Sequence, residues 1–394
     1  PREHHVARRR RRHDHRGERG RGAPRRAAGG VGGGGLRRGV RPAGPGEITY
    51  ASYLRLGDIL SAQKPESARL GVEAHDEMLF IVVHQTYELW FRQILHELDR
   101  VQDDLASEPV EDSHLARVVH SLGRVREILK LGVAQVDVLE TMTPQDFLDF
   151  RGLLSTSSGF QSLQFRLIET RLGLESSRRL LFEGKPVDAD FSEPERAALR
   201  EAERRPSLRD QLEAWLMRTP FVTGEAYAFR EAYREAVVAM LKRDRQTAEA
   251  HGETEEAAAI AEAARAFAAI FDPRSHGEWT MDPRSVEAAL FITVYRDRPV
   301  CHMPHALLAA LMDIDEAMAL WRHRHALLVE RTIGLRPGTG GSSGQDYLAR
   351  TARQHRVFPD LFRLSTYLIP RADLPPIPPR IERRMGFVYA AEGG

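Results

Sequence analysis

The sequence predicts an all-α protein: a large, bundle-like domain of long helices with a smaller helical insertion. Three observations lead to this fold class. Apolar residues recur every three or four positions almost throughout the chain after Gly46, which is the period of an amphipathic helix. No segment shows the regular alternation of apolar and polar residues that marks a half-buried strand. The 394 residues, 42% of them hydrophobic, are enough for a large core.

The predicted helices, in chain order, span residues 75–105, 113–141, 143–154, 160–172, 192–203, 208–217, 255–271 and 304–333. Local signals mark several of their ends. Thr143-Pro144 is a typical helix start, with proline at the first helical position. Gly334 and Pro337 stop the last long helix. Residues 185–285 are more polar and rich in Ala and Glu, which predicts a helical arm, and the Pro-rich part after Arg363 is expected to wrap the surface.

The chain divides into a tail, 1–46, and a single domain, 47–394. The tail holds fourteen arginines against three acidic residues, whereas the remainder holds 43 basic and 53 acidic residues. An Arg- and Gly-rich tail is compatible with nucleic-acid binding, but this one has no aromatic residue to stack on a base. We therefore expect a disordered leader, or an over-extended start because the chain begins at Pro1, and no nucleic-acid partner.

Cysteine usage and hydropathy suggest the compartment. Cys301 is the single cysteine, which excludes disulfides within the chain, Cys-rich zinc sites and Cys-ligated iron–sulfur clusters. No run of about 18 apolar residues is present, and the Arg-rich start lacks the apolar region of a signal peptide. The sequence predicts a soluble, cytoplasmic protein without a membrane partner.

The segment from Phe80 to Trp90 contains the first candidate site residue. It is apolar and helical, and it carries His84 one turn after Phe80, so the two rings share a helix face. An ionisable group on an apolar face needs a partner or a function. From this segment alone, a hydrogen-bonded core histidine and a functional histidine both remain open.

A second histidine lies on the apolar stripe of the helix predicted at 304–333. The stripe runs through Leu307, Leu311, Ile314, Met318, Trp321, His325 and Leu328. His325 falls on it, whereas His323 does not and is expected to be solvated. A lone histidine is too little for zinc, but it suffices for haem, which needs one proximal histidine and an apolar slot. A core histidine and a haem ligand both remain open here.

Two further segments carry unusual polar residues. Phe147 and Arg151 repeat the spacing of an aromatic and a polar residue one turn apart, and a buried guanidinium takes either a structural carboxylate or a ligand's carboxylate or phosphate. The loop Gly338–Gly344 resembles a phosphate cradle, but Gln345-Asp346 follow it where a P-loop has Lys and Ser or Thr. The loop is therefore a linker, or a mobile lid that offers the Thr339 hydroxyl to a small ligand.

Other metal and hydrolytic chemistries find no support. A di-iron carboxylate bundle needs two Glu-x-x-His motifs, and only Glu111 to His114 has this spacing. A Ser or Cys triad lacks a nucleophile elbow, and Cys301 lies between two prolines beside His302 with no sign of activation.

Six segments, in order, closely resemble the tryptophan 2,3-dioxygenase family: Tyr50–Leu54, His75–Trp90, Ser157–Arg166, Tyr295–Asp297, Gly338–Gly344 and Leu364–Pro370. The match covers essentially everything after Tyr50. It implies an all-helical, cytosolic homotetramer with one haem b per subunit, active in the ferrous state. It also implies that dioxygen cleaves the indole C2–C3 bond of L-tryptophan to give N-formyl-L-kynurenine, the first step of the kynurenine route of tryptophan breakdown.

The resemblance also implies which residues bind the substrate: Phe80, His84, Phe147, Arg151, Thr339, Tyr50 and Tyr53. His84 would be the catalytic distal histidine, hydrogen-bonded to the indole N–H, between the walls Phe80 and Phe147. Arg151 would bind the substrate carboxylate, and Thr339 the polar end of the amino acid. Tyr50 and Tyr53 would reach the pocket of a neighbouring subunit.

For the haem, the resemblance implies His325 as the axial iron ligand, with Trp321, Leu154, Ser158 and Gly159 beside the cofactor. The sequence departs from the family at two points. Phe147 stands where some relatives have Tyr, which removes a hydroxyl near the carboxylate, and Gly57 stands where an acid is usual. Two other functions remain open: a haem dioxygenase acting on a modified tryptophan or other indole, and a non-catalytic haem sensor.

Overall fold

The computed structural model describes residues 48–155, 157–180, 186, 188–222, 227–270, 279–334, 336 and 344–387. The tail predicted at 1–46 and the loop residue Thr339 lie outside these residues. The chain forms two compact units, Pro1–Leu60 and Ser61–Gly394. The described part contains helices and no strand, which confirms the all-α prediction.

The α-helices are α1 (Tyr50–Tyr53), α2 (Leu56–Ile59), α3 (Glu66–Leu70), α4 (Glu77–Leu105), α5 (Asp112–Leu139), α6 (Pro144–Arg151), α7 (Leu163–Leu172), α8 (Glu193–Arg204), α9 (Leu208–Leu216), α10 (Phe229–His251), α11 (Thr254–Ile270), α12 (Pro283–Val294), α13 (Pro299–Ile333), α14 (Gly344–Gln354), α15 (Pro359–Arg363) and α16 (Pro379–Glu382). Short 3₁₀ turns are η1 (Gly159–Gln161), η2 (Ser176–Arg178), η4 (Leu364–Tyr367) and η5 (Arg371–Asp373).

Within the first unit, α1 begins at a reciprocal cap. The Thr49 side chain accepts a hydrogen bond from the backbone N–H of Ser52, and the Ser52 hydroxyl accepts one from the backbone N–H of Thr49. Tyr50 and Tyr53 are 76% and 73% exposed.

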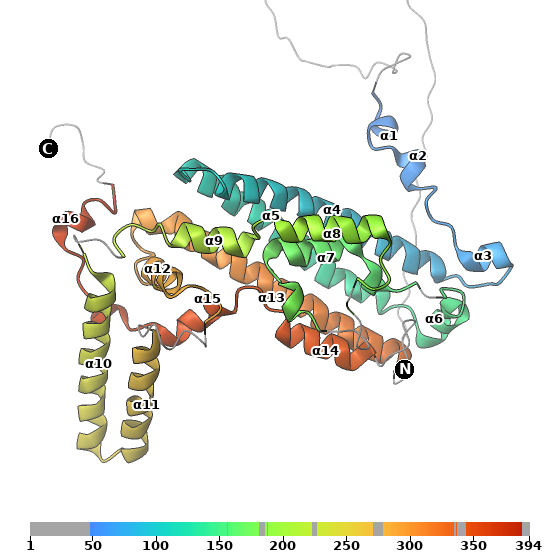
Figure 1. Ribbon diagram of the computed structural model, residues 1–394. Coiled ribbons are helices and arrows are strands. Elements are labelled where there is room, and N and C mark those ends of the chain that lie inside the picture. Colours follow the sequence, from blue (N-terminus) through green and yellow to red (C-terminus); the bar gives the residue numbers. More distant parts are fainter. Residues whose placement is uncertain are drawn as a thin grey trace, which may run out of the picture. The chain divides into compact units, whose positions relative to one another are not determined.

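In the second unit, the long helices α4, α5 and α13 pack side by side (Figure 1). Ion pairs give their directions. Arg117 of α5 pairs with Asp104 of α4, and Arg124 pairs with Glu97, each at 2.6 Å. The residue number therefore rises along α5 where it falls along α4. These two helices are antiparallel.

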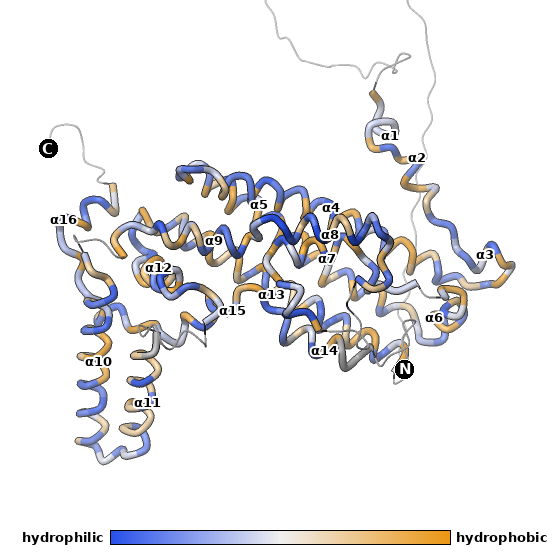
Figure 2. The backbone as a smooth tube through the Cα atoms, viewed as in Figure 1, coloured by the Kyte–Doolittle hydropathy of each residue, from blue (hydrophilic) through white to orange (hydrophobic). Residues whose placement is uncertain are grey.

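The direction of α13 follows from two further pairs with α5. Arg126 meets Asp313 at 3.0 Å and Asp137 meets Arg324 at 2.5 Å, and both pairs join residues 187 apart in the chain. The constant separation means that α13 runs parallel to α5. Hydrophobic and hydrophilic residues are interleaved along these helices (Figure 2), as expected where one face of each is buried.

The first residues of α6 and α7 agree with the capping residues that precede them in the sequence. α6 begins at Pro144 and is capped by Thr143, whose side chain forms a capping box with Asp146. α7 begins at Leu163, later than the predicted residue 160, because η1 occupies 159–161 and the Ser162 side chain caps the N–H of Phe165.

The region 185–285 contains helices that pack in different places. α8 packs against α7, and α9 against α4 and α12, whereas α10 and α11 pack against each other as a hairpin (Figure 1). Among the described helices longer than five residues, α10, α12 and α14 were not predicted from the sequence. In α12 every residue from Ser285 to Ile292 is buried, so the helix has no polar face to give a period. Among the described residues, no helix combines the length and apolarity needed to cross a bilayer.

Candidate functional site

The second unit contains a cavity of about 260 Å³, bounded by α4, α5, α6, η1, α7, α13 and α14. Its walls are mainly apolar and aromatic. The lining residues predicted from the sequence are Phe80, His84, Phe147, Arg151, Ser158, Gly159, Trp321 and His325. Eight residues predicted from separate segments therefore meet at one cavity.

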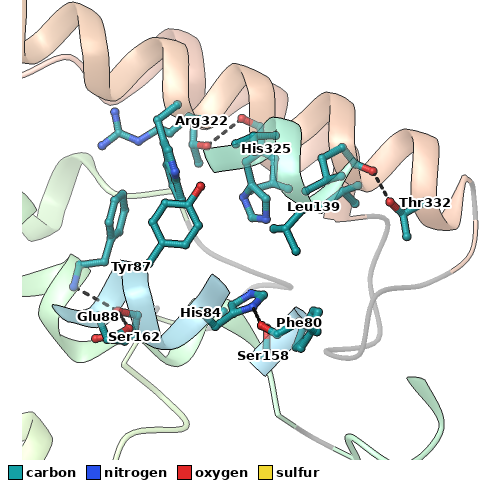
Figure 3. A pocket seen from close by; sticks show the side chains of 18 of the residues that line it. Phe80, His84, Tyr87, Glu88, Leu139, Ser158, Ser162, Arg322, His325 and Thr332 are labelled. Atoms are coloured by element: carbon teal, nitrogen blue, oxygen red, sulfur yellow. Dashed lines mark hydrogen bonds between the residues drawn. The ribbon is translucent and has the colours of Figure 1, made fainter. Parts of the chain in front are cut away.

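His84 lies on the face of α4 that borders the cavity (Figure 3). Its Nδ1 is 2.7 Å from the carbonyl oxygen of Phe80, one turn earlier. A carbonyl only accepts hydrogen bonds, so Nδ1 carries the proton and Nε2 keeps its lone pair. Burial lowers the pKa of His84, against opposing contributions from the Phe80 carbonyl and Glu88. The ring is therefore a neutral acceptor at physiological pH.

Aromatic rings pack around this histidine. The Phe80 ring lies 4.1 Å from the His84 ring and 5.9 Å from the Phe147 ring, between centroids. Phe150, fully buried, contacts both Phe80 and Phe147 edge-on. Arg151 is the last residue of α6 and is partly buried at the cavity wall. The result is an aromatic, apolar wall of the cavity, with Arg151 also among the lining residues.

His325 faces the same cavity from α13, opposite His84 (Figure 3). The Trp321 ring, one turn earlier, lies 5.3 Å from the His325 ring at an interplanar angle of 30°. Burial, with a smaller contribution from His84, lowers the pKa of His325 to about 4. His323, on the same helix, is exposed as the stripe predicted.

The surroundings of His325 fit a haem. Its Nδ1 is buried without a hydrogen-bond partner among the described residues, so the contacts of a structural core histidine are missing there. Val136, Leu139, Leu328 and Val329 give apolar walls beside it. The described residues contain no group of three or more His, Cys, Asp and Glu able to hold a bare metal ion. One neutral imidazole in an apolar slot is the donor set that haem iron uses.

Four predicted residues fall elsewhere. Leu154 follows α6 but is not among the residues that line the cavity. Tyr50 and Tyr53 belong to the first unit, whose place relative to the cavity is not determined. Thr339 lies outside the described residues. Their predicted roles stay predictions.

A buried ionic cluster at the cavity wall was not predicted from the sequence. Glu169 of α7 accepts hydrogen bonds from Arg166 and Arg322, each at 2.8 Å, and His355 lies beside it. Burial would raise the pKa of Glu169, but the arginines outweigh it and hold the pKa at about 2. The one signal in the sequence was the spacing of Arg166 and Glu169, three apart on a helix.

The fold and the cavity define an all-α protein with a buried small-molecule site between its helices. Comparison with known proteins specifies which one. The family model described as tryptophan 2,3-dioxygenase matches residues 35–368. The chain belongs to the tryptophan 2,3-dioxygenase family.

Relatives from distant organisms agree with this assignment. A tryptophan 2,3-dioxygenase from Bdellovibrio bacteriovorus is 44% identical, over 87% of this chain and 99% of the relative. Proteins of the same name from Dictyostelium discoideum and Xenopus laevis are 39% and 40% identical, over 87% and 90% of this chain and 89% and 90% of the relatives. The similarity therefore extends over nearly the whole length of these enzymes.

Proposed function

We propose that this protein is a haem-dependent dioxygenase that cleaves the indole C2–C3 bond of L-tryptophan with dioxygen and releases N-formyl-L-kynurenine. This is the first step of the kynurenine route, carried out in the cytoplasm by a homotetramer. The observation that carries the proposal is the pair of neutral imidazoles, His84 and His325, that face one cavity from opposite sides in a chain of this family.

His325 holds the iron of haem b, with Trp321, Ser158 and Gly159 at the same cavity. A neutral imidazole is the form that binds iron, and the depressed pKa of His325 keeps it neutral throughout the physiological range. The apolar walls exclude water from the slot. When bound, ferrous haem would activate dioxygen for reaction with the indole, with both oxygen atoms ending in the product and no net consumption of electrons.

His84 positions the substrate. Because Nδ1 is hydrogen-bonded to the Phe80 carbonyl, Nε2 is free to accept the indole N–H. The indole N–H is far too weak an acid for ordinary general-base removal, so His84 acts by orientation. Phe80 and Phe147 pack against the indole ring, and their apolar surfaces match it.

The polar end of the amino acid is bound at the border of the slot. The Arg151 guanidinium binds the carboxylate as a bidentate fork. The Thr339 hydroxyl, and Tyr50 and Tyr53 from a neighbouring subunit, complete this end of the pocket. An indole without carboxylate and ammonium groups cannot make these contacts and is expected to be a poor substrate.

Turnover by the ferrous protein tests the proposal. We expect formation of N-formyl-L-kynurenine from L-tryptophan, with weaker activity on ring-substituted tryptophans and on indole. Preference for a substituted tryptophan would identify a dioxygenase of another indole. Haem binding without turnover of any of these compounds would identify a sensor.

A variant pair tests the iron ligand. His325→Ala should abolish stable haem incorporation, since no second imidazole lies on the buried stripe of α13. His323→Ala is the matched control, because His323 is exposed on the same helix, and should keep the wild-type haem content. A normal Soret band in purified His325→Ala would refute the assignment.

A further inference from the structure

The ionic cluster around Glu169 forms part of the cavity wall but has no role in the proposed binding of haem and tryptophan. Arg166 and Glu169 come from α7, and Arg322 comes from α13 one turn before His325. All three residues line the cavity (Arg322 is labelled in Figure 3). Each carboxylate oxygen of Glu169 has its own partner. Oε2 lies 2.8 Å from the Arg166 guanidinium, and Oε1 lies 2.8 Å from the Arg322 guanidinium.

The cluster is withdrawn from solvent. The exposed fractions of the side chains are 6% for Arg166, 4% for Arg322 and 1% for Glu169. A buried ion pair that only joined α7 to α13 would add little to the stability of the fold, because the cost of desolvating the charges offsets most of their attraction. The charges can instead act on the contents of the cavity, since a low dielectric hardly screens them.

The charges facing the cavity do not balance. The charged side chains that line it are Arg151, Arg166 and Arg322 against Glu88 and Glu169, three positive and two negative. Within the cluster, the two guanidiniums of Arg166 and Arg322 share the single carboxylate of Glu169. Arg179 also approaches Glu169, at 4.0 Å, but it is absent from the cavity lining and has a second carboxylate, Glu203, at 3.7 Å. The neighbouring His355 is neutral, since burial lowers its pKa to about 4. This wall therefore carries one uncompensated positive charge.

We propose that Arg166, Glu169 and Arg322 form a buried charge unit that favours the ferrous over the ferric state of the haem held by His325, with Glu169 as the positioning residue that orients both guanidiniums. This inference rests on the proposed function. Reduction adds one electron to ferric haem, supplied by any one-electron reductant, and moves no atom or proton. The positive wall stabilises the reduced form because that form carries one positive charge less.

Two variants give opposite expectations. Arg166→Gln removes a positive charge and should increase the ferric-to-ferrous ratio at a fixed potential, on the order of tenfold for one charge acting across a poorly screened site. Glu169→Gln removes the negative charge with the same side-chain shape and should decrease that ratio by a similar factor. A general loosening of the fold would shift both variants in the same direction.

Glu97 of α4 offers a matched control. It is also a buried carboxylate, 3% exposed and paired with Arg124 at 2.6 Å, but it does not line the cavity. Thirteen residues of helix separate it from His84, about 20 Å. Glu97→Gln should leave the ferric-to-ferrous ratio at the wild-type value.

The measurement is a dithionite titration of the holoenzyme with redox mediators, followed in the Soret region. Opposite shifts for Arg166→Gln and Glu169→Gln, with Glu97→Gln unshifted, support the proposal. Unshifted or same-direction variants with normal haem content overturn it. If Glu169→Gln does not fold, an increased ferric-to-ferrous ratio in Arg166→Gln supports the proposal, and an unchanged or decreased ratio overturns it. A wild-type protein that binds no haem would refute the proposed function and, with it, this inference.

Discussion

The two cavity histidines differ in what their nitrogens contact, and that difference assigns their roles. Nδ1 of His84 is engaged by the Phe80 carbonyl, so this ring offers a fixed acceptor. Nδ1 of His325 has no described partner, and its ring is held by packing against Trp321. Burial keeps both rings neutral. One neutral imidazole can bind iron while the other orients an N–H donor.

Replacement of His84 tests whether this residue orients the substrate or removes a proton. His84→Ala should keep its haem, raise KM for L-tryptophan and lower kcat moderately, because one hydrogen bond is lost, typically about 1 kcal/mol. Steady-state kinetics with the ferrous enzyme provide the measurement. Complete inactivity with haem and fold intact would indicate an obligatory base.

Arg151 should decide whether an amino acid or a simple indole is the substrate. Removing one partner of a buried guanidinium–carboxylate contact costs roughly 2–5 kcal/mol. Arg151→Ala should therefore raise KM for L-tryptophan by at least one to two orders of magnitude, with unaltered haem spectra. Arg151→Lys should rescue only partly, since it has no fork.

The matched comparison for Arg151 uses a ligand instead of a second variant. An indole lacking the carboxylate should bind wild type and Arg151→Ala equally well. A preference for tryptophan over that indole that survives the substitution would show that Arg151 does not bind the carboxylate.

Helix ends control how closely the elements around the cavity pack. α7, which carries Arg166 and Glu169, is capped at its C-terminal end by Gly173 with φ +120°, a conformation that residues with a side chain rarely adopt. A Cβ on Gly173 would lie 2.6 Å from the Cβ of Arg209 in α9 and 3.0 Å from the hydroxyl oxygen of Ser207. The missing side chain is what lets the start of α9 approach the end of α7.

Gly173→Ala should accordingly destabilise the protein by roughly 2–4 kcal/mol, from backbone strain and overpacking together. Gly123→Ala in α5 is the control, because nothing lies within 4 Å of its added Cβ. In a helix interior that substitution should stabilise by about 0.5–1 kcal/mol. Urea unfolding of both variants measures the two changes, and equal stability of the two would contradict the packing argument.

The stability of the fold should depend on pH through the buried histidines. The pKa of His355 is about 4 in the folded state, lowered first by burial, against an ordinary value of 6.5. The unfolded state therefore binds more protons between these values. The stabilising contribution is fully present above pH 6.5 and is lost progressively as the pH falls toward 4.

His355→Gln should flatten this dependence. Glutamine keeps an acceptor for the Leu180 N–H, which His355 Nε2 accepts at 3.2 Å, but it takes up no proton. Urea unfolding at several pH values between 7 and 4.5 should give a smaller slope for the variant than for wild type. Identical slopes would show that His355 is not a source of the acid sensitivity.

Periodicity and helix caps were enough to predict much of the helical framework. The predicted helices at 75–105, 113–141 and 304–333 correspond to α4, α5 and α13, because each has a clear apolar stripe. α12 escaped because it is buried on all sides, and α14 begins within the glycine-rich loop, at Gly344. A helical period of apolar and polar residues appears in the sequence only where one face of the helix is buried and the other is exposed.

The residues of the site were predicted from local motifs and from their resemblance to a family. That they meet at one cavity follows from how the helices pack. Nothing in the sequence states that Phe80 and Phe147 touch, or that His84 and His325 face one cavity. The Glu169 cluster is the clearest case, because Arg322 lies 153 residues from its carboxylate partner. Spacings of three and four residues determine the helices and the contacts within each of them. A contact between residues far apart in the chain, such as Arg322 and Glu169, depends on how α7 and α13 pack. Only the tertiary structure decides them.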